Sequence, residues 1–257
     1  MSPDLRYERQ GSTALITFDR PASRNAMTWE MYEALHGACE QIDADDEVRV
    51  AVLRGEGGEA FVAGTDIRQF LDFRDAEDGL AYERRITDII ERVEAVTVPT
   101  IAVIEGYAVG GGLVLAAACD LRIVAPTAKF GLPIARTLGN CLSMSTCRRL
   151  VTLIGPARTL ELVYTAEFID ADRAVVIGLA NEVVARAELD ARVEDLCERL
   201  EAHAPRTMWA TKQAIRRLGT QASPDADDLV RACYGSEDFQ EGVAAFVEKR
   251  PPRWTGR

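Results

Sequence analysis

The sequence has no long run of apolar residues. No stretch of its 257 residues approaches the roughly 18 to 20 apolar positions that a helix needs to cross a bilayer. The opening residues MSPDLRYERQ also lack the apolar stretch of a secretory signal. We therefore expect a protein that does not enter a membrane and that works in the cytoplasm.

Histidine and paired cysteine are scarce as well. The chain has two histidines, His36 and His203, and no His-x-x-x-His or Cys-x-x-Cys spacing, so a zinc site has almost no ligands to draw on. The six cysteines are scattered, mostly among apolar neighbours: Cys39, Cys119, Cys141, Cys147, Cys197 and Cys233. They are typical of reduced core thiols. We expect no metal and no permanently bound cofactor.

Positive charge is in the minority. Thirty Lys and Arg residues stand against 41 Asp and Glu, a formal net charge of −11 at pH 7. This balance repels nucleic acid and anionic lipid at long range, so neither is an expected partner. A polyanionic ligand would have to be held locally, and the basic residues able to do so lie near the two ends of the chain: Arg20, Arg24, Lys249 and Arg250.

Short apolar strands alternate with helical stretches over most of the chain. Residues 5–10 and 14–18 flank the turn-forming pair Gly11-Ser12 and predict a hairpin. Four further strands are expected, at residues 48–53, 100–104, 121–125 and 182–184. Strands that alternate with helices are typical of an α/β fold with a parallel sheet.

Helices are expected to begin near Thr28 and again after Thr65 and Asp66, either of which could cap the second one. Residues 72–83 are rich in charge and predict a solvated helix or a loop. After residue 188 the strand pattern ends, and the last helical stretch, 236–250, stops before Pro251-Pro252. We therefore divide the chain into an α/β core, 1–188, and a helical region, 189–257.

Three consecutive glycines, Gly110 to Gly112, follow a buried strand and begin an apolar helical run. Glycine lets the backbone approach a ligand closely, and the unpaired N–H groups of a first helical turn favour developing negative charge, as in an enolate. A tight packing turn or a phosphate loop is the alternative, although the dinucleotide and Walker patterns are missing. A second strand, 59–64, also ends in glycine and by itself predicts only a capped helix.

Together, the two segments resemble the paired oxyanion loops of the crotonase (enoyl-CoA hydratase/isomerase) superfamily, A-F-x-A-G-x-D-[IL] and G-x-[AC]-x-G-G-G. The matching stretches are A-F-V-A-G-T-D-I at 60–67 and G-Y-A-V-G-G-G at 106–112. Further similar stretches extend over the whole chain: R-P-A-S-R-N-A-M at 20–27, A-K-F-G-L-P at 128–133 and A-F-V-E-K-R at 245–250.

The resemblance implies a fold and an activity. The fold is a spiral of ββα units with a C-terminal helical region that forms trimers, often paired into hexamers. The activity is that of an enoyl-CoA hydratase/isomerase-like enzyme, a lyase or isomerase, that stabilises the enolate of a CoA thioester substrate.

The resemblance also implies site residues. The oxyanion donors fall on the backbone N–H groups of Thr65 and Gly111. Thr65 stands where alanine is common, a change that a backbone donor tolerates. The contacts to CoA fall on Arg24, Ala26, Ala63, Asp66 and Ile67, with Phe246 and Lys249 as contacts that a neighbouring subunit could contribute.

The sequence departs from the family at the two catalytic glutamates, whose positions hold Val114 and Ile134. Neither side chain exchanges a proton, and general acid–base catalysis contributes ~10²- to 10⁴-fold, so efficient hydration by the usual route is not expected. In the loop that follows, Asn140 could orient water or a substrate carbonyl, Arg136 could pair with a carboxylated acyl group, and Cys141 lacks a nearby histidine.

Other acids could enter the pocket, although a surface position is expected for most of them: Asp66, Asp72, Asp75, Glu77, Asp78, Glu83 and Glu105. We hypothesise an enolate-stabilising enzyme whose proton-transfer group lies at an unusual position, and which isomerises, decarboxylates or hydrolyses an acyl-CoA if it does not hydrate one. The alternatives are a catalytically weak acyl-CoA binder and a purely structural trimer.

Overall fold

The computed structural model describes residues 2–71, 73–220, 228, 232 and 235–257, with the backbone alone for residues 220, 240, 243, 246 and 247. Within this part of the chain, the larger of two sheets holds six strands in the order β1-β2-β3-β5-β7-β10. Their bounds are β1 (Leu5–Gln10), β2 (Thr13–Phe18), β3 (Val50–Gly55), β5 (Thr100–Ile104), β7 (Leu121–Val124) and β10 (Glu182–Val183). Only β1 and β2 pair in antiparallel fashion, as the hairpin pattern predicts, and the other neighbours are parallel.

The smaller sheet consists of very short strands in the order β4-β6-β8-β9. Their bounds are β4 (Ala60–Val62), β6 (Tyr107–Val109), β8 (Lys129–Gly131) and β9 (Ile169–Asp170). Three residues are too few to show an alternation of apolar and polar positions, which is why the sequence did not predict β6, β8 and β9 as strands.

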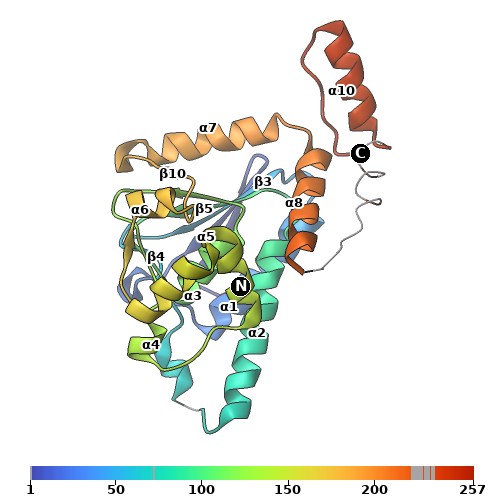
Figure 1. The fold of residues 1–257 in the computed structure, drawn as a ribbon. Coiled ribbons are helices and arrows are strands. Elements are labelled where there is room, and N and C mark those ends of the chain that lie inside the picture. The colour runs from blue at the N-terminus through green and yellow to red at the C-terminus, as the bar shows by residue number, and fades with distance from the viewer. Residues whose placement is uncertain (1, 72, 221–227, 229–231, 233–234) are drawn as a thin grey trace.

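Helices cover both faces of the larger sheet (Figure 1). Their bounds are α1 (Trp29–Ala44), α2 (Ala76–Ala95), α3 (Gly111–Ala118), α4 (Ile134–Thr137), α5 (Met144–Thr165), α6 (Ala171–Val176), α7 (Leu189–Glu201), α8 (Pro205–Thr220) and α10 (Glu237–Glu248). Short 3-10 turns are η1 (Pro21–Ser23), η2 (Ile67–Phe70) and η3 (Arg186–Glu188). The prediction of an α/β fold is confirmed.

The two faces of the sheet pack against different helices because successive strand residues point in opposite directions. Leu53 of β3 joins the main core together with Leu35 of α1. Its neighbour Val52 joins a second cluster with Leu189 and Cys197 of α7. Because α7 packs on this sheet, the first helix of the predicted helical region is part of the same body, and the division at residue 188 stays a prediction.

Two local predictions differ from the structure. The segment after Asp66 forms the short turn η2 instead of an α-helix, and the side chain of Ile67 is exposed. Asp66 does cap this turn, since its side chain accepts the N–H of Arg68. The α-helix begins later, as α2, where Asp75 accepts the N–H groups of Glu77 and Asp78.

Five cysteines fall in the described part of the chain and are free thiols, whereas Cys233 lies outside it. In that same part, no helix combines the length and the apolar character that crossing a membrane requires.

Gly112 is the point where α3 touches β4, because a Cβ added to it would overlap the Val62 carbonyl. We expect Gly112→Ala to lower the free energy of unfolding by ~2 kcal/mol or more. Gly37 of α1 has no atom within 4 Å of an added Cβ, so Gly37→Ala should raise stability by ~0.5 to 1 kcal/mol through helix propensity. Urea unfolding of the two variants measures the contrast, and equal stabilities would contradict the close contact.

Candidate active site

The candidate site lies where two strands of the smaller sheet end together. Strands β4 and β6 pair in parallel, so their carboxyl ends meet at the same edge of the sheet. After β4 the chain turns through Gly64 to Thr65, and after β6 it turns through Gly110 to Gly111, the first residue of α3. The pairing therefore places the two glycine turns side by side.

The turns contact each other through their backbones. Gly64 has a φ of +100° and Gly110 a φ of +55°, in the range that L-residues rarely adopt. A Cβ added to Gly110 would lie 3.8 Å from the Cα of Gly64. Glycine at these two places is thus required by the positive φ of the turns, which lie in contact with each other.

The amide of Thr65 lies beside residue Gly111. A Cβ added to Gly111 would be 3.9 Å from the backbone N of Thr65. Neither amide donates a hydrogen bond to another residue in the described ranges, whereas the neighbouring Gly110 and Asp66 amides do. Two unpaired N–H groups this close can hold one anionic oxygen.

The predicted CoA-binding residues lie on two segments that run beside each other. The backbones of segments 24–27 and 63–66 are joined by hydrogen bonds of 3.0 Å from Ala63 to Arg24, 2.8 Å from Met27 to Gly64 and 2.9 Å from Asp66 to Met27. The structure therefore brings Arg24, Ala26, Ala63, Asp66 and Ile67 together beside the two amides.

Asn25 locks the first of these segments onto β4. Its buried side chain accepts the Arg20 N–H at 2.9 Å and donates to the carbonyls of Glu56 at 3.0 Å and Ala60 at 2.8 Å. This anchoring leaves the Arg24 guanidinium 5.4 Å from the centre of the Tyr107 ring.

Asp66 is held by two arginines. Its carboxylate pairs with Arg68 at 2.6 Å and with Arg20 at 3.0 Å, and its side chain is only 11% exposed. The hydrogen bonds from Arg68, with help from the backbone and Arg20, hold the pKa of Asp66 well below its usual range. The main chain of Asp66 is occupied as well, since its N–H donates to the Met27 carbonyl and its carbonyl accepts from Gln69, so Asp66 ties the two segments together.

In the described part of the chain, no hydrogen bond joins the remaining predicted residues to the two amides. Asn140 and Cys141 are exposed between α4 and α5. Lys249 follows α10, which stands apart from the α/β body in Figure 1, and the side chain of Phe246 lies outside the described residues. Val114 and Ile134 are buried, at 6% and 8% exposure.

The structure adds two tyrosines that sequence reasoning missed. The Thr65 hydroxyl lies 2.8 Å from the Tyr32 hydroxyl and 3.0 Å from that of Tyr82. Tyr32 belongs to α1 and Tyr82 to α2, and nothing in the sequence spacing links them. Glu83, next to Tyr82, is half-buried, and burial raises the pKa of its carboxyl.

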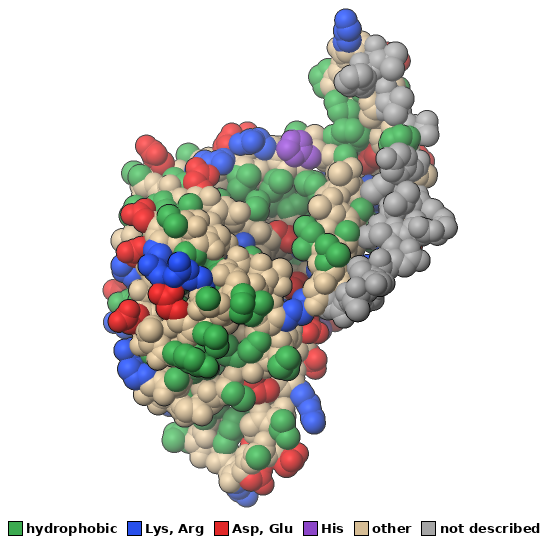
Figure 2. All heavy atoms as spheres, viewed as in Figure 1, with side chains coloured by type: hydrophobic (Ala, Val, Ile, Leu, Met, Phe, Trp, Pro, Cys, Tyr) green, Lys and Arg blue, Asp and Glu red, His purple; other side chains and the backbone are tan. Residues whose placement is uncertain are grey.

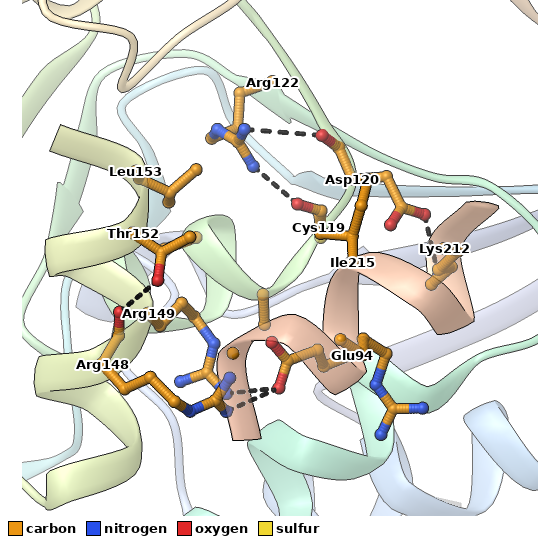
Figure 3. A pocket seen from close by; sticks show the side chains of 14 residues that line it. Glu94, Cys119, Asp120, Arg122, Arg148, Arg149, Thr152, Leu153, Lys212 and Ile215 are labelled. Carbon is orange, nitrogen blue, oxygen red and sulfur yellow. Dashed lines mark hydrogen bonds and ion pairs between the residues drawn. The ribbon is translucent and has the colours of Figure 1, made fainter. Parts of the chain in front are cut away.

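A separate cavity of about 230 Å³ lies at the other end of α3, between α5 and α8 (Figure 3). Several of its charged groups are paired with each other, and Arg122 donates to the backbone carbonyls of Cys119 and Leu179. Arg149 donates to Glu94 at 2.9 Å, and Lys212 donates to Asp120 at 2.7 Å. We therefore assign no anion-binding role to this cavity.

The chain is similar to known proteins over almost its whole length. A family model described as enoyl-CoA hydratase/isomerase matches residues 8–257. A short-chain-enoyl-CoA hydratase of Clostridium acetobutylicum is 33% identical over 248 residues, 95% of this chain and 94% of the relative. A crotonyl-CoA hydratase of Syntrophomonas wolfei is 34% identical over 254 residues, 96% of each. A solved structure, an enoyl-CoA hydratase/carnithine racemase from Magnetospirillum magneticum, has a TM-score of 0.93 at 35% identity and covers 100% of this chain and 97% of its own.

We expect Asp66→Asn to lower the free energy of unfolding at pH 7 by ~1 to 2 kcal/mol, because it removes charged hydrogen bonds and leaves the partly buried Arg20 without its closer carboxylate. Because the pKa of Asp66 is lowered in the fold, its carboxylate stabilises the wild-type protein at pH values above 3.8, the ordinary pKa of an aspartate. This contribution to stability is lost as the pH falls below that value. The difference between the two proteins should therefore shrink below that pH. Urea unfolding at pH 7 and pH 3 tests this, with the exposed Asp88→Asn as control.

Proposed function

Because the chain belongs to the enoyl-CoA hydratase/isomerase family of the crotonase superfamily, we propose that it binds an acyl-CoA thioester and stabilises the enolate formed from it. The observation that carries this proposal is the closeness of two unpaired backbone amides, those of Thr65 and Gly111. Each such donor contributes ~2.7 to 4 kcal/mol when it meets charge that develops during reaction.

The proposed step moves one proton and one electron pair. A base removes the proton from the α-carbon of the acyl group, and the electron pair left behind moves onto the thioester oxygen. The Thr65 and Gly111 amides donate to that oxygen as it becomes negative. Segments 24–27 and 63–66 would hold the CoA beside it, through Arg24, Ala26, Ala63, Asp66 and Ile67.

The proton-transfer residue cannot be Val114 or Ile134, since neither side chain titrates. Most of the remaining acids have other partners. Asp75 and Asp78 accept backbone N–H groups at the start of α2, and Glu105 pairs with Arg54 and Arg186. Asp72 lies outside the described residues.

Glu83 fits the role of proton-transfer residue best. It is half-buried and follows Tyr82 directly on α2, and the Tyr82 hydroxyl lies 3.0 Å from that of Thr65. A carboxyl whose pKa is raised by burial is a stronger base than an exposed one. We therefore propose Glu83 as the acid–base residue, in place of Asn140.

Subunit association stays a prediction. Exposed apolar side chains gather on α5 and α8, and Figure 2 shows hydrophobic side chains over the part of this face where α5 lies. Those on the two helices are Met144, Val151, Leu160, Tyr164, Ile215 and Leu218. Such patches are typical of contacts between proteins. They support the homotrimer or hexamer, in which Phe246 and Lys249 of one subunit would serve the site of another.

A panel of enoyl-, 3-hydroxyacyl- and 3-ketoacyl-CoA thioesters tests the function. We expect tight binding of at least one class and its turnover by the wild type. Gly111→Pro removes one of the two amides and should reduce turnover by ~10²- to 10³-fold. Gly111→Ala adds bulk but keeps the N–H, so it should retain more turnover than the proline variant.

Tight binding without turnover of any thioester would favour the alternative of a catalytically weak acyl-CoA binder. The buried Val114 and Ile134 support that alternative, because neither side chain can transfer a proton. No affinity for any thioester would refute both functions. Equal turnover by Gly111→Pro and wild type would refute the oxyanion hole.

If Glu83 is the base, turnover requires its ionised form. We expect kcat/KM to rise with pH through a pKa above the ordinary value of 4.5, because burial raises it. Glu83→Gln should lose this rise and ~10²- to 10⁴-fold of the rate. The exposed Glu77→Gln, on the same helix, is the control. A pH profile unchanged by Glu83→Gln would show that another residue transfers the proton.

A further inference from the structure

Three hydroxyl groups form a chain beside the two amides. The Thr65 hydroxyl is its centre, 2.8 Å from Tyr32 and 3.0 Å from Tyr82. The chain thus joins α1, the turn after β4, and α2. Alanine at position 65 would keep the backbone amide but would interrupt the chain.

The chain reaches Gly111 as well. A Cβ added to Gly111 would lie 2.8 Å from the Tyr32 hydroxyl and 3.5 Å from the Thr65 hydroxyl. The Tyr32 oxygen therefore lies at the same glycine whose amide is one of the two proposed donors. A ligand oxygen between the amides of Thr65 and Gly111 would be close to this end of the chain.

Proton counting leaves one hydroxyl proton over. Three hydroxyl groups carry three protons, and the two hydrogen bonds between them use two. In the described part of the chain, these hydroxyls have no other hydrogen-bond acceptor. One proton therefore remains to be donated to a ligand, and it lies on Tyr32 when Tyr82 donates to Thr65 and Thr65 donates to Tyr32.

The hydroxyls of Tyr32 and Tyr82 stay protonated at neutral pH and can therefore donate hydrogen bonds. Burial raises the pKa of Tyr82 to about 12 and that of Tyr32 well above its ordinary value. Protonated phenols serve as hydrogen-bond donors to an anion.

The donors are also held in place before a ligand arrives. Tyr32 is 1% exposed. The ring of Tyr82 lies 4.8 Å from Phe70, 5.7 Å from Trp29 and 5.9 Å from Phe73, measured between ring centres. Packed donors need little reorganisation during a reaction, which is the condition under which they stabilise a transition state.

We infer that the chain of Tyr32, Thr65 and Tyr82 donates a third hydrogen bond, through Tyr32, to the oxygen held between the Thr65 and Gly111 amides. This inference rests on the proposed function, since it needs an enolate oxygen at that place. Tyr32 is then a catalytic residue, and Thr65 and Tyr82 are positioning residues through their side chains.

A structural role for the same contacts is the alternative. The chain would then tie α1 and α2 to the turn and affect stability alone. The two roles differ in the acidity of a bound thioester, because only a donor to the enolate oxygen makes the α-proton easier to remove.

Acetoacetyl-CoA is a suitable probe, because its α-proton is acidic and its enolate absorbs in the ultraviolet. We expect binding to the wild-type protein to lower the pKa of the probe, seen as enolate absorbance at lower pH. Tyr32→Phe and Thr65→Val should each reduce the ratio of bound enolate to ketone by ~10-fold, since a hydrogen bond to a charged group is lost. Thr65→Ser, which keeps the hydroxyl, should restore most of that ratio relative to Thr65→Val.

The control is Tyr7→Phe, which removes a hydroxyl from a partly buried side chain on β1. If Tyr32→Phe and Thr65→Val bind the probe and leave its pKa as in the wild type, the chain is structural and the inference is overturned. If the wild type itself does not bind the probe or lower its pKa, the proposed function fails and the inference with it. Should Thr65→Val not fold, the comparison of Tyr32→Phe with Tyr7→Phe decides, because each removes a single oxygen.

Discussion

The parallel pairing of β4 with β6 is the constraint on which the rest of the site depends. Both strands leave the sheet at the same edge, and each continues into a turn whose positive φ favours glycine. Gly64 and Gly110 supply the positive φ of the two turns, and Gly112 lets α3 lie directly on β4. As a result, the first turn of a helix faces the end of a strand, and two amides remain unpaired beside each other.

The chemistry divides between backbone and side chains. A backbone donor is present whatever residue occupies its position, so a threonine at position 65 leaves the amide in place. Proton transfer needs a particular side chain, and such a group can come from any element that borders the site. This difference explains how Val114 and Ile134 are compatible with the proposed enolate chemistry if Glu83 on α2 supplies the base. The Thr65 side chain has a separate part to play, because its hydroxyl bonds to those of Tyr32 and Tyr82.

Much of the fold followed from sequence patterns. The N-terminal hairpin, the buried strand β5 and helix α1 were predicted because each repeats its apolar positions over five or more residues. The three-residue strands β6 and β8 are too short for such a pattern, and their pairing is decided by the longer elements around them. The helix expected after Asp66 became the short turn η2, since this segment has little apolar surface to bury: Ile67 is 55% exposed and Leu71 is 82% exposed.

By itself, the sequence determined the family resemblance, the glycine turns and the positions that lack a titrating group, because each of these is written in residues close together along the chain. It did not reveal the cluster of Tyr32, Thr65 and Tyr82, whose members are 33 and 17 positions apart. Periodicity shows which face of a helix is apolar, but not which two faces meet. Only the packing of α1 and α2 against the turn after β4 decided that these three hydroxyls share one site.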